Sequence, residues 1–281
     1  MKKFVLSLIA FVFCFSLYSQ NAVLIYQQNS KPLLVSLTNI NKVSHSDTIQ
    51  TLEIIPNIWD IKTFISDIDS LVFVEKEFCN VDYRTLTCPD KNHPHAIDLG
   101  LPSGTKWACC NVEASAPEEY GGYYAWGETE TKSVYAPETY QYYLGRDSVS
   151  HYPIYEYIGD DIAGTEYDVA YKKCGVTWRM PSKEQIEELQ DNCISDRFGL
   201  NNVRGALIFG TNGAKLFFPR SGFYSNSTQH AVDLMGVFWS SSHRQDHSRQ
   251  AFYILVQELG ALGIGSIAEQ CEGMPVRPVQ Q

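Results

Sequence analysis

The sequence predicts an α+β protein, in which a small N-terminal β module precedes a larger domain with one main helix and a β meander. Three observations lead to this prediction. Short β-branched runs separated by turn residues occupy positions 20–76, a helix start signal occurs near Ser182, and several apolar, strand-like runs follow that helix. Short strands bounded by turn residues, combined with an isolated helix pattern, are typical of this fold class.

The N-terminus has the layout of a secretory leader. Lys2 and Lys3 precede a mostly apolar run from Phe4 to Tyr18, and polar residues follow. This run is shorter than the roughly 20 apolar residues that a membrane-spanning helix needs. We therefore predict a signal peptide over 1–19 and export to the periplasm, the cell surface or the medium. No later stretch has the length and apolar character of a transmembrane segment, so we expect none.

The charge of the chain disfavours two classes of partner. The formal net charge is −10, and removal of the leader, with its two lysines and no acidic residue, makes it −12. An acidic surface repels phosphate groups, and no cluster of Lys or Arg offsets this repulsion. Nucleic acid and anionic membranes are therefore not expected to bind.

Residues 20–76 contain an internal repeat. The segments VSLTNINKVS (35–44) and TFISDIDSLV (63–72) align at a period of 28 residues, and each follows a β-rich apolar run. Two copies are too few for a solenoid. We predict a small β module of two related units, similar to N-terminal segments of exported proteins from Bacteroides-like bacteria.

The segment 77–95 has the polar, proline-containing composition of a linker. His93 and His95 flank a proline there, and we interpret them as solvated turn residues rather than metal ligands. Seven cysteines remain after leader removal, of which Cys79 and Cys88 form the best local disulfide pair. No cysteine spacing typical of zinc sites occurs.

The domain at 96–281 begins with two strands separated by a glycine turn. The second, KWACCNV, would direct the side chains of Cys109 and Cys110 to opposite faces. An aromatic strand is expected before Gly127. The tyrosine-rich segment 131–168 is predicted to be a long structured loop, because its tyrosines need a surface to pack against.

Ser182 and Gln185 form a capping box, which predicts a helix over 183–193. Farther along the chain, Asn212-Gly213 lies between two apolar runs and predicts a hairpin. Further strands are expected at GVFWSSS, QAFYILVQEL and MPVRPV.

Five separated motifs of this domain occur in an order that resembles a known family. They are LGLPSGTKWACCNV, EEYGGYYAWGETE, VTWRMPSKEQIEEL, VFWSSS and VRPV. Together they resemble the Fibrobacter succinogenes major paralogous domain, which is common on exported proteins of Bacteroidetes. That family is similar to the C-type-lectin-like superfamily and, within it, to formylglycine-generating enzymes (the sulfatase-modifying-factor-like fold). The resemblance implies a C-type-lectin-like fold for 96–281.

The same resemblance allows a test for enzyme activity. Formylglycine-generating enzymes bind copper through two closely spaced cysteines late in the domain, because two thiolates suit this soft metal. After Cys193 this chain has only Cys271, so no catalytic residue is carried over. Hydrolase and nucleotide-binding motifs are also absent from the sequence. We expect a non-enzymatic protein without a cofactor; a degenerate or unrecognised enzyme on the same scaffold is the alternative.

Lectin-like folds place binding groups on long loops and on the exposed meander. The polar run SHRQDHSRQ at 242–250 is the first candidate for a face that binds a glycan or a protein, and a solvated hairpin tip is its alternative. The predicted ligand-binding residues are Trp239, Ser242, His243, Arg244, Asp246, His247, Arg249 and Gln250.

A second candidate is a tyrosine cluster that would stack on sugars or form a satellite core: Tyr140, Tyr142, Tyr143, Tyr152, Tyr155 and Tyr157. Calcium is a weaker alternative, because the sequence lacks the carboxylate and amide motifs of calcium-dependent lectins. The layout of the C-terminal region also resembles retroelement-diversified lectin-fold proteins, which makes a diversified binding face a further alternative.

Overall fold

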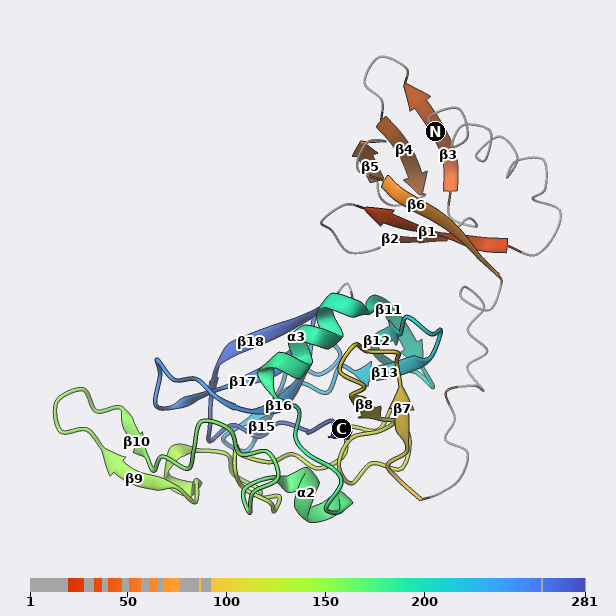
Figure 1. Cartoon of the computed structure of the whole chain (residues 1–281). Helices are drawn as coiled ribbons and strands as arrows, with labels where there is room; N and C mark the ends of the chain where they lie inside the picture. The colour runs from red at the N-terminus through yellow and green to blue at the C-terminus, as the bar shows by residue number, and fades with distance from the viewer. Residues whose placement is uncertain are drawn as a thin grey trace. The chain divides into compact units, whose positions relative to one another are not determined.

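The computed structural model describes Leu86, residues 92–258 and residues 260–280 in full, together with the backbone of six strands between positions 20 and 75. The chain folds as two compact units, Met1–Asp82 and Tyr83–Gln281, shown in Figure 1. Their boundary falls within the segment 77–95. The predicted signal peptide and the predicted Cys79–Cys88 pair lie outside the described residues.

The first unit contains two three-stranded antiparallel sheets, with strand orders β2-β1-β6 and β3-β4-β5. The strands are β1 Gln20–Gln27, β2 Leu33–Ser36, β3 Ile40–Ser46, β4 Thr51–Pro56, β5 Ile61–Phe64 and β6 Ile68–Glu75.

The strand pairing in this unit follows the sequence repeat. Strands β2 and β5 begin 28 residues apart, and so do β3 and β6. Each half supplies a hairpin, and its third strand joins the hairpin of the other half: β6 pairs with β1, and β3 pairs with β4. A two-stranded hairpin alone is marginal in water, and a third strand from the other repeat completes each sheet.

The second unit is mostly β-sheet with few helices. Its strands are β7 Ala96–Asp98, β8 Lys106–Ala108, β9 Tyr143–Arg146, β10 Pro153–Tyr155, β11 Ile194–Leu200, β12 Val203–Phe209, β13 Lys215–Pro219, β14 Phe223–Ser225, β15 Thr228–His230, β16 Gly236–His243, β17 Gln250–Val256, β18 Leu262–Glu269 and β19 Val279–Gln280. Three three-stranded sheets have the orders β19-β8-β7, β11-β12-β13 and β16-β17-β18, and β9–β10 and β14–β15 are hairpins. The last strand thus pairs with one of the first strands of the unit, which brings the two ends of this unit together.

The predicted helix is confirmed as α3, Lys183–Asn192. The Ser182 hydroxyl accepts a hydrogen bond from the Gln185 backbone N–H (3.3 Å), and the side-chain amide oxygen of Gln185 accepts one from the Ser182 backbone N–H (3.0 Å). Ile186 and Leu189 are fully buried, and α3 packs against the sheet β16-β17-β18, as Figure 1 shows. Spacing of these two residues on one face explains why the helix forms here.

A second, shorter helix, α2 (Val169–Cys174), was not predicted. Its N-cap is Asp168, which is buried and accepts hydrogen bonds from the N–H groups of Ala170 and Tyr171. The same carboxylate accepts hydrogen bonds from Gly164 and Met180, so it connects α2 to the segment that leads into α3. Six residues give too little periodicity for recognition by sequence pattern.

The hairpin around Asn212-Gly213 is confirmed, since β12 and β13 flank the loop 210–214. Only Gly213 has a positive φ (84°). Asn212 instead acts through its side chain, which donates to the Asp98 carbonyl and accepts from the Ala214 N–H. The loop is therefore longer than the two-residue turn that the sequence suggested.

Three strand predictions were wrong in extent. The strand KWACCNV ends at Ala108 and bends at Cys109, and the aromatic stretch before Gly127 makes only an isolated bridge between Tyr124 and Met274. MPVRPV enters a strand ladder only at Val279, and its first residue, Met274, makes that isolated bridge. Pro275 and Pro278 have no N–H to donate to a ladder.

Strand β18 completes the meander and was missed because glycines interrupt its apolar pattern. Gly265 pairs with Tyr253 of β17, and the tyrosine ring occupies the space that a Cβ at this position would need. Glycine here reflects a close approach across the sheet rather than a turn.

The core of this unit forms around buried aromatic residues. Trp107 packs with the apolar faces of α3 and β16–β18, and Trp126 and Trp239 belong to a neighbouring cluster. In the described residues, no helix has the length and apolar character to cross a membrane.

Candidate functional site

The segment predicted to bind a ligand divides into a buried and an exposed part. Trp239 is fully buried, and its indole N–H donates to the Tyr124 carbonyl (2.8 Å). His243 is also buried, with its ring 5.7 Å from that of Trp126. The prediction that Trp239 contacts ligand is therefore wrong: β16 is buried on both faces, with Phe238 in one core cluster and Trp239 in the other.

Ser242 serves the scaffold as well. Its hydroxyl accepts a hydrogen bond from the Lys183 N–H (3.0 Å), which connects β16 to the start of α3. Trp239 and His243 are therefore buried, and Ser242 is half-buried. The run from Arg244 to Gln250 forms the tip between β16 and β17.

Arg244 organises this tip. Its guanidinium makes a bidentate pair with Asp246 (2.8 and 3.0 Å) and donates to the Gln250 side chain and to the Ser266 carbonyl. Bidentate guanidinium contacts fix geometry as well as charge. Arg244 therefore holds the loop in shape, while Asp246 and His247 remain exposed.

The structure brings the two candidate regions together. Tyr152, 59% exposed, lies beneath the Arg249 guanidinium at 4.5 Å from the ring centroid, and Tyr157, 65% exposed, meets the His243 ring at 5.8 Å. Four other tyrosines of the predicted cluster pack inward, so the satellite-core interpretation applies to them: Tyr140, Tyr142, Tyr143 and Tyr155. We call the exposed surface the hairpin face, made of Tyr152, Tyr157, Arg244, Asp246, His247, Arg249 and Gln250.

The β9–β10 hairpin, whose loop contains Tyr152, extends outward from the rest of the second unit, as Figure 1 shows. Its exposed apolar side chains include Leu144, Val149 and Ile154. Exposed apolar side chains that gather in one place, rather than singly, are typical of interaction surfaces.

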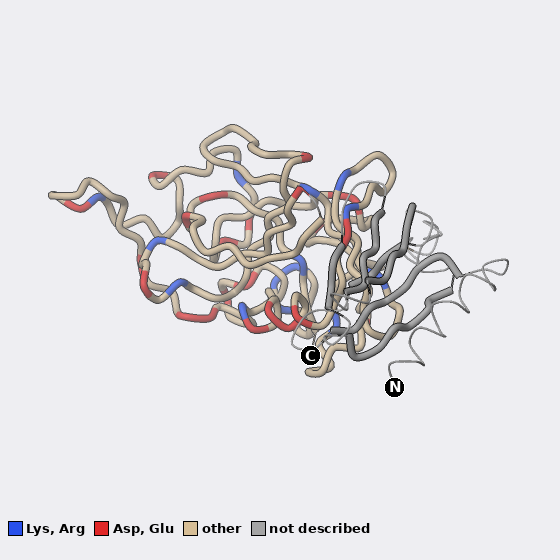
Figure 2. Tube along the Cα trace, turned by 90° about the horizontal axis from the view of Figure 1, so that it is seen from above, with Lys and Arg blue, Asp and Glu red and all other residues tan. Residues whose placement is uncertain are grey.

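Charged groups beneath the hairpin face are coupled. Arg249 pairs with Glu269 at 3.1 Å. Burial raises the pKa of Glu269, and burial together with the Glu269 carboxylate raises the pKa of Glu272 to about 7. Figure 2 shows basic and acidic residues interspersed along the described trace.

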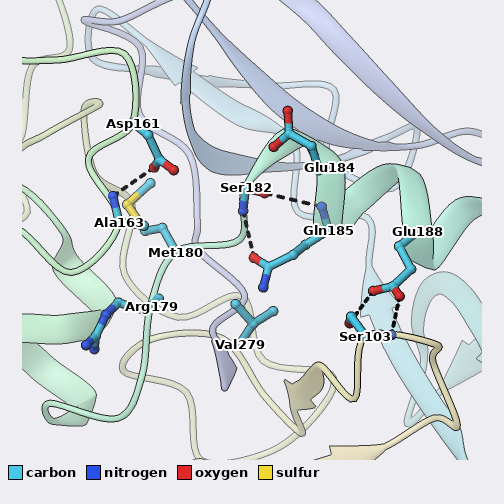
Figure 3. Close-up of a pocket in the computed structure, with 10 residues that line it drawn as sticks. All are labelled: Ser103, Asp161, Ala163, Arg179, Met180, Ser182, Glu184, Gln185, Glu188 and Val279. Atoms are coloured by element: carbon cyan, nitrogen blue, oxygen red, sulfur yellow. Dashed lines mark hydrogen bonds between the residues drawn. The ribbon is translucent and has the colours of Figure 1, made fainter. Parts of the chain in front are cut away.

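A pocket of about 510 Å³ lies at the start of α3 (Figure 3). Many of its polar groups already bond one another: Glu188 accepts from Ser103, Asp161 accepts from the Ala163 N–H, and the capping box occupies one wall. Arg179 donates to the carbonyls of Val176 and Trp178. The volume of the pocket is adequate for a small ligand, but most of its lining side chains already bond to other parts of the protein.

Two catalytic interpretations can be tested on this geometry. Cys271 is buried among tyrosines, and burial raises the pKa of its thiol to about 11, so it is protonated at neutral pH. In the described residues no hydrogen bond joins Ser242 to His243 or His247, which a Ser-His arrangement would require. The geometry therefore favours neither thiolate-based metal chemistry at Cys271 nor Ser-His hydrolysis at Ser242.

Sequence reasoning missed one cluster. His93 and His95 are half-buried rather than solvated, and Cys109 and Cys110 lie on the same side of a bend rather than on opposite faces of a strand. In the described part of the chain, this is where three metal-ligating side chains converge: His93, Cys109 and Cys110. Only the spacing of two adjacent cysteines and a His-x-His pair could have signalled it.

Comparison of the chain with protein-family models, with curated proteins and with solved structures found no match.

Proposed function

We propose that the chain is a non-enzymatic binding protein whose second unit is a C-type-lectin-like domain of the Fibrobacter major paralogous type, and that it binds carbohydrate through the hairpin face. The observation that carries this proposal is the contact of Arg249 with the exposed Tyr152 ring. It joins two segments far apart in sequence into one surface with an aromatic ring and several planar polar groups.

The chemistry of this surface suits a sugar. An exposed tyrosine ring offers an apolar face for ring C–H groups, and Tyr157 supplies a second one. Asp246 and Gln250 already bond to Arg244, and the remaining lone pairs of the Asp246 carboxylate and of the Gln250 amide oxygen can accept hydrogen bonds from neighbouring sugar hydroxyls. Because Arg244 already fixes this loop, its groups are preorganised for binding.

The proposed fold is supported by the arrangement of the second unit. Its first and last strands lie in one sheet, and a long segment with its own tyrosine core lies between the first strands and the meander. This is the layout in which loops vary at little cost to the core.

A protein ligand is the second candidate, favoured by the exposed aliphatic side chains of the β9–β10 hairpin. The degenerate-enzyme alternative is disfavoured by the buried, protonated Cys271.

Binding of the full chain to a glycan array, with calcium and with chelator, tests the proposal. We expect reproducible binding that Arg249→Ala and Tyr152→Ala each reduce at least tenfold. Arg204→Ala, an exposed arginine on β12, is the matched control and should leave binding unchanged. Absence of binding to any glycan, or equal loss in the Arg204 control, would count against the hairpin face; metal-dependent oxygen uptake with a thiol substrate would favour an enzyme.

A further inference from the structure

The segment that enters the second unit and the end of β8 bring four metal-ligating side chains together. Cys109 Sγ lies 3.6 Å from His93 Nδ1 and 3.6 Å from His95 Nδ1. Cys110 Sγ lies 3.5 Å from His93 Nδ1, and the two sulfurs are 3.5 Å apart. We propose that His93, Cys109 and Cys110 bind a zinc ion, with His95 as the fourth ligand.

These separations match a zinc tetrahedron before any ion is present. With Zn–S bonds of about 2.3 Å and Zn–N bonds of about 2.05 Å, a tetrahedron has S···N edges of about 3.5 Å and S···S edges of about 3.8 Å. The observed S···N distances of 3.5 and 3.6 Å agree with those edges, and the S···S distance of 3.5 Å is slightly shorter. Binding by His93, Cys109 and Cys110 therefore requires only small side-chain shifts. His95, which is 3.6 Å from Cys109 but lies outside this group of mutually close ligand atoms, has to move further to complete the tetrahedron.

The ligand set selects the metal. Two thiolates and two imidazoles in tetrahedral geometry are typical of zinc, whereas calcium and magnesium need oxygen ligands. Both sulfurs are buried, with Cys109 4% and Cys110 0% exposed, and the two histidines are half-buried, so the thiolate side of the site is shielded from solvent as in structural zinc sites.

The backbone around the cluster supports a thiolate at Cys109. The His95 N–H points at Cys109 Sγ (3.1 Å), and the Cys109 N–H donates to the His95 carbonyl (2.9 Å). Hydrogen bonds of this kind orient and stabilise metal-bound ligands. The buried Arg277 guanidinium also donates to the Cys109 carbonyl (2.9 Å), which places a cation beside the thiolate-bearing bend.

Cys110 is different, because its sulfur lies 3.2 Å from the Ala114 carbonyl, within reach of a thiol proton. Zinc binding would displace this proton together with that of Cys109.

The bound ion would join residues 93–95 to the end of β8, so its role would be to fasten the entry segment to the rest of the second unit. None of these residues belongs to the hairpin face.

Titration of the reduced, metal-free full chain with Co²⁺ and then Zn²⁺ tests the site. We expect one Co²⁺ per chain with sulfur-to-cobalt charge-transfer absorption, displacement by Zn²⁺, and release of about two protons per zinc ion at a pH where both thiols are protonated. Cys109→Ser, Cys110→Ser and His93→Gln should each weaken binding at least a hundredfold, and His95→Gln at least tenfold. Cys174→Ser, a half-buried cysteine outside the cluster, should bind like the wild type.

X-ray absorption of the zinc-loaded wild-type chain keeps the test independent of variants that fail to fold. Two sulfurs at about 2.3 Å and two nitrogens at about 2.0–2.1 Å are expected. A shell of oxygen and nitrogen alone, cobalt binding without charge-transfer absorption, or uptake of Cu⁺ but not Zn²⁺ would overturn the assignment. Unchanged zinc affinity in His95→Gln would remove His95 from the ligand set.

Discussion

Two arginines of the second unit make the same contact in opposite environments. The Arg249 guanidinium lies 4.5 Å from the centroid of Tyr152, and that of Arg277 lies 4.8 Å from the centroid of Phe218. The Arg249 side chain is 24% exposed and pairs with Glu269, whereas Arg277 is completely buried and bonds to Asn111 and three backbone carbonyls. An arginine on a ring is thus part of the buried framework at Arg277, whereas at Arg249 it lies at the surface, where we propose that it binds ligand.

Arg277→Met, which removes the buried arginine, should have the largest effect on the stability of the protein. The change leaves Asn111 and the carbonyls of Ala108, Cys109 and Phe217 without their donor, and buried polar groups without partners are costly. We expect a loss of about 3–5 kcal/mol in the free energy of unfolding, measured by chemical denaturation. Arg204→Met is the exposed control, with an expected change within about 0.5 kcal/mol; equal effects would show that burial is not the deciding factor.

The carboxylates beneath Arg249 give the next effect, as a function of pH. The pKa of Glu272 is raised to about 7 from an ordinary value of 4.5. Because the pKa of Glu272 is higher in the folded chain than in the unfolded chain, ionising this side chain favours unfolding. The stability of the wild type is therefore full below about pH 4.5, where Glu272 is protonated in both states, and falls as the pH rises through 7. Glu272→Gln removes that loss.

The Glu272→Gln variant should therefore unfold like the wild type at pH 4 but be more stable at pH 8, by on the order of 2 kcal/mol after allowance for partial exposure. Thermal or denaturant unfolding at the two pH values measures the difference. Glu184→Gln, on the first turn of α3, is the control and should show no such pH dependence. A wild-type stability that does not fall between pH 5 and 8 would contradict the raised pKa.

Variants at the start of α3 test whether the pocket there serves the framework or binds a ligand. Ser182→Ala removes one half of the capping box and should lower the unfolding free energy by about 1 kcal/mol. Ser182→Asn, which retains a capping acceptor, should restore most of this loss. A change in ligand binding without a change in stability would assign the pocket to function instead.

Arg249→Ala should have the smallest effect on stability and the largest on binding. A partly exposed ion pair and a surface ring contact each contribute about 0.5–1 kcal/mol, so we expect a stability loss of about 1 kcal/mol or less. Calorimetry on the full chain gives the stability, and the bound fraction on the glycan array gives the function. A stability loss as large as that of Arg277→Met would place both arginines in the framework.

The outcome for the hairpin face shows what a sequence pattern cannot separate. The run from Trp239 to Gln250 predicted one polar site, but β16 is buried on both faces, which places Trp239 in the core. The Ser242 hydroxyl, in turn, holds the start of α3. Arg249 and Tyr152 are almost a hundred residues apart in sequence, and no local pattern joins them. The cluster of His93, Cys109 and Cys110 was missed for a related reason: the expected strand would have separated the two thiols, whereas the chain bends after Ala108.

The sequence by itself determined the features that depend on neighbouring residues. The capping box at Ser182, the helix that follows it, the Asn212-Gly213 hairpin and the strands β16 and β17 follow from local periodicity and hydrogen bonding. The tertiary structure alone decided which polar residues are buried, which loops meet and where the two cysteines point. These properties depend on contacts between segments distant in sequence, whose free energies come from packing and desolvation rather than from local conformational preference.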